Sequence, residues 1–356
     1  MGKKITDSVT IRSMNLQNRI FAGPIGAITR SDDGTVSDAM VEHFRTVAAN
    51  GAGLILQGAM CVSNVHRAHT TQMCLTNDAQ IEGLRRITDA VHAEGGKIFI
   101  QLEHPGMRAL SDAPLAPFPF VMEAEGGVKK VCHVMSEEDI SFVRQEYISA
   151  GKRAILAGYD GLEIHASHGW LPNAFINPGI NIREDKYGQE RTLFVQEIVE
   201  EMRAQSPADF AIGIRMGGFD PDLKDGIENA KSFERMGVDY LDISNNPSKK
   251  FLPQNLYAPE NYPFSPHEFS AAEIKKSVNI PVIGAKSIRT MEEAQAVLAK
   301  TNLDMIQIAR PFLCDPLWVT KAFSGGEQII CKHCNKCPWR LGGQNCAAII
   351  TAGQQA

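Results

Sequence analysis

Two histidines three residues apart, His165 and His168, are the residues of this sequence best placed to do chemistry. They close the run GYDGLEIHASHGW, whose apolar residues predict a strand over Gly161–His165 with both imidazoles at or just past its end. Two ring N–H groups there could donate to one anionic or carbonyl oxygen, and such charge-assisted bonds are worth about 1.5–3 kcal/mol each. Metal ligation is an alternative, but no obvious third ligand accompanies the pair. Two purely structural histidines are the other.

Other polar residues also stand where predicted strands end, although a buried barrel strand needs none there. Gln57 and Gln101 close two strands, and Arg215 closes a third in AIGIRMGG. A buried arginine requires a partner, because an unpaired charge in the interior is very costly. A planar, acceptor-rich ligand or a local Asp/Glu residue could supply that partner.

Two further strand ends, in PVIGAKSIRT and MIQIARPFLCDP, predict a phosphate site. The loops after the last two strands of an eight-stranded barrel often bind phosphate, through backbone N–H groups and a helix N-terminus. Here the backbone of Ser287, Ala309 and Arg310 would contact the phosphate, and Lys286 and Arg310 would add charge.

The arrangement of short and long apolar patterns predicts an α/β fold. Helical spacing over Ile81–Glu94 and Phe142–Ala157 alternates with short β-rich runs, which predicts parallel strands joined by crossovers in a single (β/α)8 TIM barrel. A doubly wound sheet is the alternative, but no G-x-G-x-x-G turn follows any predicted strand. The predicted strands are Arg19–Ala22, Gly53–Gln57, Lys97–Gln101, Gly161–His165, Phe210–Arg215, Tyr240–Ser244, Val282–Ala285 and Met305–Ala309.

Two long insertions and a C-terminal segment interrupt this rhythm. Ala109–His133 and Asn245–Pro266 follow predicted strands, so we expect both at the C-terminal mouth of the barrel, where loops build active sites. The barrel pattern stops after Phe323. We therefore predict a barrel domain over residues 1–325 and a short cysteine-containing appendage over residues 326–356.

The composition excludes several classes of function. The chain has 356 residues, a net charge of −5 and no block of Lys or Arg, so we expect no nucleic-acid partner. No stretch reaches the roughly 18 apolar residues needed to span a bilayer, and the first residues lack the apolar core of a signal peptide. These features predict a cytoplasmic protein with no membrane partner, and a homo-oligomer is possible.

The order of the motifs resembles the Old Yellow Enzyme family of NAD(P)H:flavin oxidoreductases. Each motif is weak by itself, whereas nine in this order and spacing are specific, and they cover nearly the whole chain from Asn18 to Trp318. In sequence order they are NRI followed by GP, GAGLILQGA, IQLEHPG, GYDGLEIHASHGWL, NIREDKYG, IGIRM, GVDYLDIS, IPVIGAKSIRT and IARPFLCDP.

The resemblance implies an FMN cofactor with NAD(P)H as electron donor, and it assigns roles. Gln101 resembles the residue that hydrogen-bonds the pyrimidine edge of the flavin. Arg215 resembles the residue beside flavin N1 and O2, whose charge stabilises the anionic reduced flavin. His165 and His168 resemble the pair that binds the activating oxygen of an enone or enoate. The other implied cofactor contacts are Pro24, Ile25, Gly26, Ala59, Lys286, Ser287, Ala309 and Arg310.

Several positions depart from the family pattern. Gly26 replaces a Thr or Cys whose hydrogen bond tunes flavin O4. Trp170, which we expect beside the substrate, replaces the tyrosine that in many relatives donates a proton to the substrate α-carbon. The run Tyr187–Arg191 is shortened, which alters a surface loop. The phosphate loop reads Ala285–Ser287 where relatives have glycines, so we expect the phosphate to bind with Lys286 turned outward.

Four clustered cysteines, Cys331, Cys334, Cys337 and Cys346, resemble the iron–sulfur segment of larger, multidomain members of the family. Four thiolates could hold a [4Fe–4S] cluster or a zinc ion. The spacing departs from those relatives, with two residues rather than three between Cys334 and Cys337 and a shorter gap to the fourth cysteine. Reduced cysteines without a metal are the alternative that this departure favours.

Together these features predict an FMN-dependent oxidoreductase acting on a small molecule. NAD(P)H would reduce the flavin, leave, and be replaced by an electron-poor alkene or a related acceptor. A flavin-dependent demethylase or dehydrogenase that oxidises a C–N bond is one alternative, because oxidation needs no proton donor and Trp170 replaces the tyrosine. A non-redox phosphate-binding aldolase or isomerase is another, and a binding protein without turnover a third.

Overall fold

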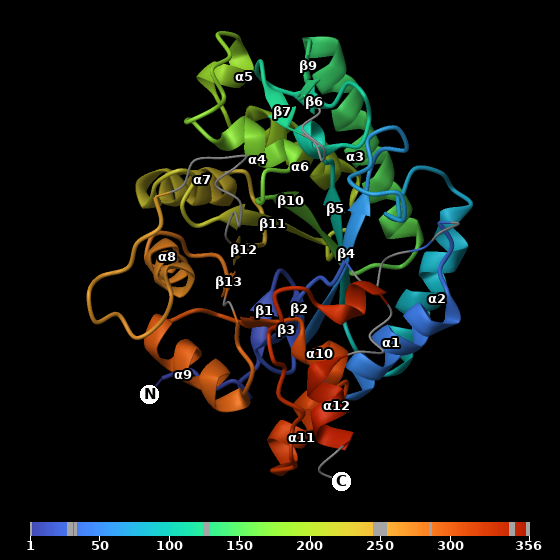
Figure 1. Cartoon of the computed structure of the whole chain (residues 1–356), viewed down its shortest axis with the longest axis vertical. Coiled ribbons are helices and arrows are strands. Elements are labelled where there is room, and N and C mark those ends of the chain that lie inside the picture. The colour runs from blue at the N-terminus through green and yellow to red at the C-terminus, as the bar shows by residue number, and fades with distance from the viewer. Residues whose placement is uncertain are drawn as a thin grey trace.

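Eight parallel strands form the centre of the fold and helices surround them (Figure 1). The computed structural model describes residues 2–26, 31, 34–123, 129–244, 255–284, 287–341 and 346–353. The barrel strands are β3 (Ile20–Ala22), β4 (Leu54–Cys61), β5 (Ile98–Glu103), β10 (Gly161–Ala166), β11 (Ala211–Gly217), β12 (Tyr240–Ser244), β13 (Val282–Gly284) and β14 (Ile306–Ile308). Each of them overlaps one predicted strand.

The strands close into a ring. Their order is β13-β12-β11-β10-β5-β4-β3-β14, and a parallel bridge between Ile283 and Met305 joins the two ends. β14 lies beside β3 with Ile306 opposite Ile20, so the first and last strands of the barrel are neighbours. The predicted (β/α)8 barrel is therefore confirmed.

Helices cover the outside of this ring in Figure 1. The longer ones are α1 (Asp38–Ala49), α2 (Gln80–Ala93), α3 (Glu137–Leu156), α6 (Leu193–Gln205), α7 (Leu223–Arg235), α8 (Pro266–Lys275) and α9 (Met291–Thr301). The shorter ones are α4 (Leu171–Ile176), α5 (Lys186–Gln189), α10 (Pro311–Cys314), α11 (Trp318–Ser324) and α12 (Ala347–Gly353), with 3-10 turns η1 (Gly106–Arg108) and η3 (Pro338–Leu341).

Helix α2 agrees with the predicted helix over Ile81–Glu94, but α3 begins earlier than predicted, at Glu137 rather than Phe142. A capping box explains the earlier start: Ser136 accepts from the backbone N–H of Asp139, and the Asp139 carboxylate accepts from the backbone N–H of Ser136. The acidic residues of the first turn interact favourably with the positive end of the helix dipole. Because these residues are not apolar, the helical spacing of apolar residues becomes visible only after them.

Successive side chains of a strand point to opposite faces, so they pack alternately against the outer helices and into the barrel interior. In β5, Ile98, Ile100 and Leu102 pack in the cluster shared with the helices, whereas Phe99 lies in the cluster inside the barrel. That inner cluster is apolar and comes from the lower part of the strands. Its barrel members are Phe21, Leu54, Leu56, Phe99, Ala211, Tyr240, Ile283 and Met305.

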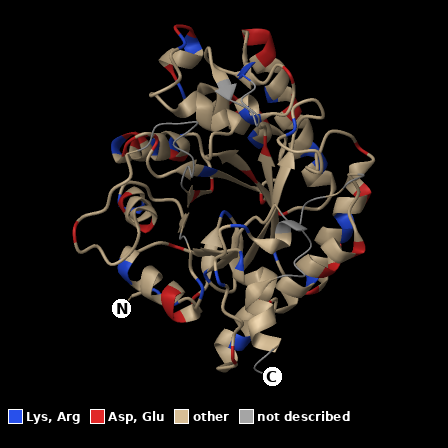
Figure 2. Cartoon of the chain, viewed as in Figure 1, with Lys and Arg blue, Asp and Glu red and all other residues tan. Residues whose placement is uncertain are grey.

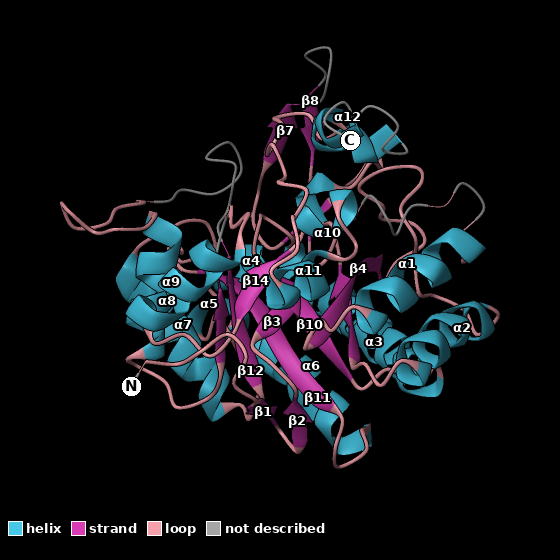
Figure 3. Cartoon of the chain, turned by 90° about the horizontal axis from the view of Figure 1, so that it is seen from below, coloured by secondary structure: helices cyan, strands magenta, loops and turns pink. Residues whose placement is uncertain are grey.

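An antiparallel hairpin closes the lower end of the barrel. β1 (Val9–Ile11) pairs with β2 (Met14–Leu16), and Ile11, Met14 and Leu16 belong to the inner cluster. Figure 3 shows this hairpin at one end of the barrel and α12 at the other. The apolar plug leaves the C-terminal end of the strands as the place for a site.

The first predicted insertion, Ala109–His133, contains short strands that pair locally. β6 (Leu115–Ala116) pairs with β9 (His133–Val134), and β7 (Val121–Glu123) with β8 (Lys129–Val131). Of the second, Asn245–Pro266, residues 245–254 lie outside the described residues. Figure 2 shows acidic and basic residues interspersed on the outer helices. None of the helices described is long and apolar enough to cross a membrane.

The C-terminal cysteine segment packs against the barrel. Cys314 at the end of α10 lies in one hydrophobic cluster with Cys346 and Ala348, next to Ile329. The buried Asp315 carboxylate forms an ion pair with Lys321 and accepts from the backbone N–H of Ile329, with distances of 2.9 Å and 2.8 Å from Oδ2. Residues on both sides of the predicted boundary at 325 and 326 therefore share contacts.

We predict that Gly213→Ala destabilises the barrel. A Cβ on Gly213 would lie 2.1 Å from Cζ of Tyr240, inside the apolar plug, and overpacking of this kind costs about 1–3 kcal/mol. Urea denaturation should show a lower midpoint. Gly353→Ala is the matched control, because its added Cβ meets no described atom within 4 Å. Equal midpoints for the two variants would contradict the close packing of Gly213 on Tyr240.

Candidate active site

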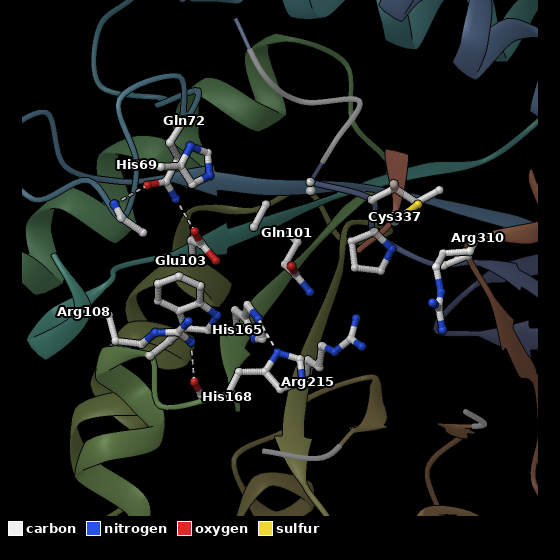
Figure 4. Close-up of a pocket in the computed structure, with 18 of the residues that line it drawn as sticks. His69, Gln72, Gln101, Glu103, Arg108, His165, His168, Arg215, Arg310 and Cys337 are labelled. Carbon is white, nitrogen blue, oxygen red and sulfur yellow. Dashed lines mark hydrogen bonds between the residues drawn. The ribbon is translucent and has the colours of Figure 1, made fainter. Parts of the chain in front are cut away.

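A cavity of about 620 Å³ opens where the barrel strands end (Figure 4). Its wall takes residues from the ends of β4, β5, β10 and β11 and from the loops after β3 and β14, which is the C-terminal mouth. Most of the predicted site residues meet here. Those that line the cavity are Pro24, Ile25, Gly26, Ala59, Gln101, His165, His168, Trp170, Arg215, Ala309, Arg310, Cys334 and Cys337.

Four predicted residues are not among these. Ser287 is exposed and does not line the cavity, and Lys286 lies outside the described residues. Cys331 and Cys346 line a smaller cavity next to this one. Of the predicted phosphate contacts, Ala309 and Arg310 are therefore the ones that the described structure places in the wall. The roles of Lys286 and Ser287 stay predictions.

Gln101 in the cavity wall is hydrogen-bonded into a network of buried polar side chains. Gln101 Nε2 donates to Glu163 Oε1 at 2.7 Å, and the Tyr240 hydroxyl donates to Glu163 Oε2 at 3.1 Å. Burial, reinforced by the nearby Asp242 carboxylate, raises the pKa of Glu163 to about 8. Because the amide nitrogen of Gln101 is bonded to Glu163, the amide oxygen is the atom that Gln101 offers to a ligand.

Arg215 brings a positive charge into the cavity wall from β11. Nη1 lies 3.3 Å from Asp242 Oδ2, and Nη2 donates to Ser244 Oγ and Gln307 Oε1 at 3.2 Å each. Nε is buried and has no hydrogen-bond partner among the described residues. Burial raises the pKa of Asp242, although the charge of Arg215 opposes this shift. The unsatisfied Nε donor suits an acceptor-rich ligand.

The two histidines contact each other. His165 Nε2 lies 3.2 Å from His168 Nδ1, His168 Nε2 lies 2.9 Å from Ser244 Oγ, and His165 Nδ1 lies 3.3 Å from Ser167 Oγ. Burial, followed by the nearby charges of His168, Arg215 and Arg108, pushes the pKa of His165 well below its usual value, so His165 is neutral. A ligand oxygen that binds this pair must replace one of these contacts.

Trp170 is fixed as a wall of the cavity. The guanidinium of Arg108 lies over its ring, 4.5 Å from the centroid, and donates through Nη1 to the His168 carbonyl at 2.7 Å. The His165 ring centroid is 5.8 Å from that of Trp170. Trp170 thus supplies a flat apolar surface beside the histidines and no hydroxyl.

Several residues of the wall were missed by the sequence analysis: Gly58, Ala68, His69, Gln72, Glu103, Arg108, Leu313 and Asn335. Glu103 could have been found, because residues two apart in a strand share a face and Gln101 was assigned to the site. His69 and Gln72 come from the loop between β4 and α2, where no periodicity shows which way a side chain points.

The cysteines gather beside this cavity without forming a metal site in the described residues. Cys331, Cys334, Cys337 and Cys346 line one small cavity together with Cys314, and Cys334, Cys337 and Arg310 line both cavities. In the described parts of the chain, no three or more His, Cys, Asp or Glu side chains are arranged to hold a metal ion. The described residues therefore contain no preformed site for the predicted cluster or zinc ion.

The sequence matches the NADH:flavin oxidoreductase / NADH oxidase family over residues 5–328. The chain belongs to this family. The resemblance to the Old Yellow Enzyme family is thereby confirmed. Membership of this family supports neither the non-redox aldolase or isomerase nor the binding protein without turnover.

The chain is similar along most of its length to several characterised proteins. It is 33% identical to the metal reductase of Desulforamulus reducens over 97% of this chain and 53% of that protein. It is 30% identical to the NADH oxidase of Thermoanaerobacter brockii over 91% of this chain and 52% of that protein. The chain thus spans about half the length of both. An old yellow enzyme homologue from Zymomonas mobilis has a TM-score of 0.75 at 25% identity, covering 93% of this chain and 95% of that one.

The cavity fits the flavin of this family. Its volume of about 620 Å³ lies within the roughly 300–1,000 Å³ usual for cofactor sites. Arg215 offers a partly buried cation and Gln101 an amide, and both groups could hydrogen-bond the polar edge of a flavin. A Cβ on Gly26 would meet no described atom within 4 Å, so the wall is open where relatives carry Thr or Cys.

We predict that Arg215→Met weakens FMN binding about tenfold to a hundredfold, because a hydrogen bond from a charged group is worth about 1.5–3 kcal/mol. The dissociation constant can be measured by quenching of flavin fluorescence on titration into the apoprotein. Arg215→Met/Asp242→Asn is the matched control, because it removes the carboxylate that the single variant leaves buried without its cation. Wild-type affinity in both variants would show that Arg215 does not contact the cofactor.

Proposed function

We propose that this protein is an FMN-dependent NAD(P)H oxidoreductase that reduces an electron-poor alkene, such as an enone or enoate. When bound, FMN supplies two-electron transfer between the nicotinamide and the acceptor. The observation that carries the proposal is the convergence of one amide, one guanidinium and two imidazoles in one cavity, those of Gln101, Arg215, His165 and His168.

Arg215 and Gln101 would hold the pyrimidine edge of the isoalloxazine. The Arg215 guanidinium would stabilise negative charge at that edge in the reduced state, and Asp242 holds the guanidinium in place at 3.3 Å. Gln101 presents its amide oxygen to a ligand N–H, because its nitrogen is bonded to Glu163.

Arg310 and the backbone of Ala309 would bind the cofactor phosphate. Figure 4 shows Arg310 and Cys337 on one side of the cavity and Arg108 and Glu103 on the opposite side. This separation suits a long ligand with its phosphate at Arg310, and it leaves the space beside Arg108 for the acceptor.

His165 and His168 would bind the carbonyl oxygen of the acceptor. A ring N–H of each imidazole can donate to a ligand oxygen, and the pair already lies within hydrogen-bond distance of Ser244 and Ser167. A carbonyl oxygen that replaces the contact with Ser244 accepts from His168, which draws electron density from the conjugated double bond and makes its β-carbon a better hydride acceptor.

Oxidation of a C–N bond is the second candidate function, and Trp170 is the observation that favours it. An oxidation needs no proton donor, and Trp170 offers none while its ring is covered by Arg108. A demethylase would be reduced by an N-methylated amine, whereas the enzyme proposed above is reduced by NAD(P)H and reoxidised by an enone.

We also propose that Cys331, Cys334, Cys337 and Cys346 bind a [4Fe–4S] cluster or zinc once the metal draws them together. Support comes from the cavity that all four line, because metal sites often form only on binding. Iron, zinc and acid-labile sulfide should approach stoichiometric amounts in anaerobically purified protein, and Cys334→Ser should lower them. Metal-free protein that retains its flavin would contradict this and favour reduced thiols.

We predict that replacing both histidines, His165→Ala/His168→Ala, slows reoxidation of the reduced protein by an enone about tenfold to ten-thousandfold. This range corresponds to loss of one or two hydrogen bonds of about 1.5–3 kcal/mol each in the transition state. Stopped-flow absorbance should show a smaller change in the reduction by NAD(P)H and unchanged flavin content.

His92→Ala is the matched control for this experiment, because His92 lies on the outer helix α2 and pairs with Asp160, away from the cavity. Reoxidation of the double variant at the wild-type rate would show that the histidines are structural. A wild-type protein that no enone reoxidises, but that an N-methylated amine reduces, would instead establish the second candidate function.

A further inference from the structure

Glu103 is a carboxyl in the cavity wall that the functions above leave unused. It ends β5, where alternation places Phe99, Gln101 and Glu103 on the inner face of the barrel. Glu103 is 3% exposed, and it lines the same cavity as His165 and His168. In the part of the chain that the structure describes, it is the one carboxyl of this wall.

The loop after β4 holds Glu103 in place. Gln72 Nε2 donates to Glu103 Oε1, while Gln72 Oε1 accepts from the backbone N–H of Ala68 at 2.6 Å. The Ala68 bond orients the Gln72 amide so that its nitrogen faces the carboxyl. No hydrogen bond to Glu103 Oε2 is found within the described residues, so this oxygen is available to a ligand in the cavity.

The environment keeps a proton on this carboxyl at neutral pH. Burial raises the pKa of Glu103 to about 8, although the nearby Arg108 charge and the Gln72 hydrogen bond both lower it. Burial outweighs Arg108 while that guanidinium stacks on Trp170 and donates to the His168 carbonyl. An acid with a pKa near the working pH is protonated often enough to act and weak enough to be reprotonated.

The other groups that face Glu103 do not replace it as an acid. The thiol of Cys61 and the hydroxyl of Tyr147 have pKa values raised well above their usual range, mainly by the hydrogen bond to Cys74 and by burial, respectively. Cys74 has its pKa lowered by its hydrogen bond with Cys61, but it lies outside the described wall. The titratable and charged groups that interact with Glu103 are Arg108, Cys61, Cys74 and Tyr147, and those that share its cavity wall are His69, Arg108, His165, His168, Arg215, Arg310, Cys334 and Cys337.

We propose that Glu103 is the proton donor to the acceptor bound in this cavity and that it takes the place of the hydroxyl that Trp170 lacks. The inference rests on the alkene reduction proposed above. Saturating the double bond requires a hydride at the β-carbon, supplied by the reduced cofactor, and a proton at the α-carbon. The O–H bond of the Glu103 carboxyl breaks, a C–H bond forms at the α-carbon, and the carboxylate regains a proton from water.

The test compares Glu103→Gln with the wild type, since this variant keeps an oxygen to accept from Gln72. Reoxidation by an enone should be slower by about a hundredfold or more, the usual contribution of a general acid. In the wild type the rate constant should fall above pH 8, where the carboxyl loses its proton, and in the variant it should not depend on pH there. Reduction by NAD(P)H and flavin content should stay unchanged.

A second readout needs no turnover. The infrared spectrum of the wild type minus that of Glu103→Gln at pH 7 should contain the carbonyl band of a protonated carboxyl, and this band should vanish as the pH passes 8. Subtraction cancels the bands of other buried carboxyls. Glu146→Gln is the matched control, because burial also raises the pKa of Glu146, to about 7, while Glu146 is not among the described residues of the wall. Its kinetics should match the wild type.

Rescue separates a proton donor from a structural role. Trp170→Tyr in the Glu103→Gln background places a hydroxyl beside the histidines and should recover part of the lost reoxidation rate. Wild-type reoxidation and pH dependence in Glu103→Gln, or a difference spectrum without the carboxyl band, would overturn the assignment while leaving the proposed function intact. If no enone reoxidises the wild type, the proposed function fails and this inference fails with it.

Discussion

The polar groups at the C-terminal mouth of the barrel are arranged around the guanidinium of Arg215, which needs hydrogen-bond acceptors on all of its nitrogens. Asp242, Ser244 and Gln307 contact its outer nitrogens, yet its buried Nε finds no partner among the described residues. Because a buried donor without an acceptor is costly, such a site favours a ligand that brings a hydrogen-bond acceptor. Below these polar groups the barrel is filled by the apolar inner cluster, and Tyr240 of that cluster donates a hydrogen bond to Glu163.

The strands could be predicted because each is a short apolar run between turn residues, and eight of them in alternation with helices leave few other architectures. The start of α3 could not, because its acidic first turn carries no apolar periodicity. The pairing of β6 with β9 could not either, since it joins segments of the insertion whose sequences are too short to show a pattern.

The site was predictable where chemistry stands at a strand end, as for Gln101, Arg215 and the two histidines. Glu103 was overlooked although the same alternation that selected Gln101 selects it. The contacts between His165, His168 and Ser244 could not be predicted from the sequence, because they join β10 and the loop after it to the end of β12, and β11 lies between these two strands in the sheet. The approach of Cys334 and Cys337 to the cavity depends on packing at α10, which no local pattern encodes.

The pairing of β3 with β14 has a consequence for how the protein comes to exist. The cavity needs Pro24 from one side of that seam and Arg310 from the other, so it cannot form on a nascent chain until β14 has left the ribosome. At about 5–20 residues per second, synthesis reaches β14 on the order of tens of seconds after β3. During that time β3 can pair with β4 but has no strand on its other edge, and contacts between residues so far apart in the sequence form slowly. The cofactor can therefore bind only after β14 has been synthesised and has paired with β3, and chaperones can bind the incomplete barrel before that point.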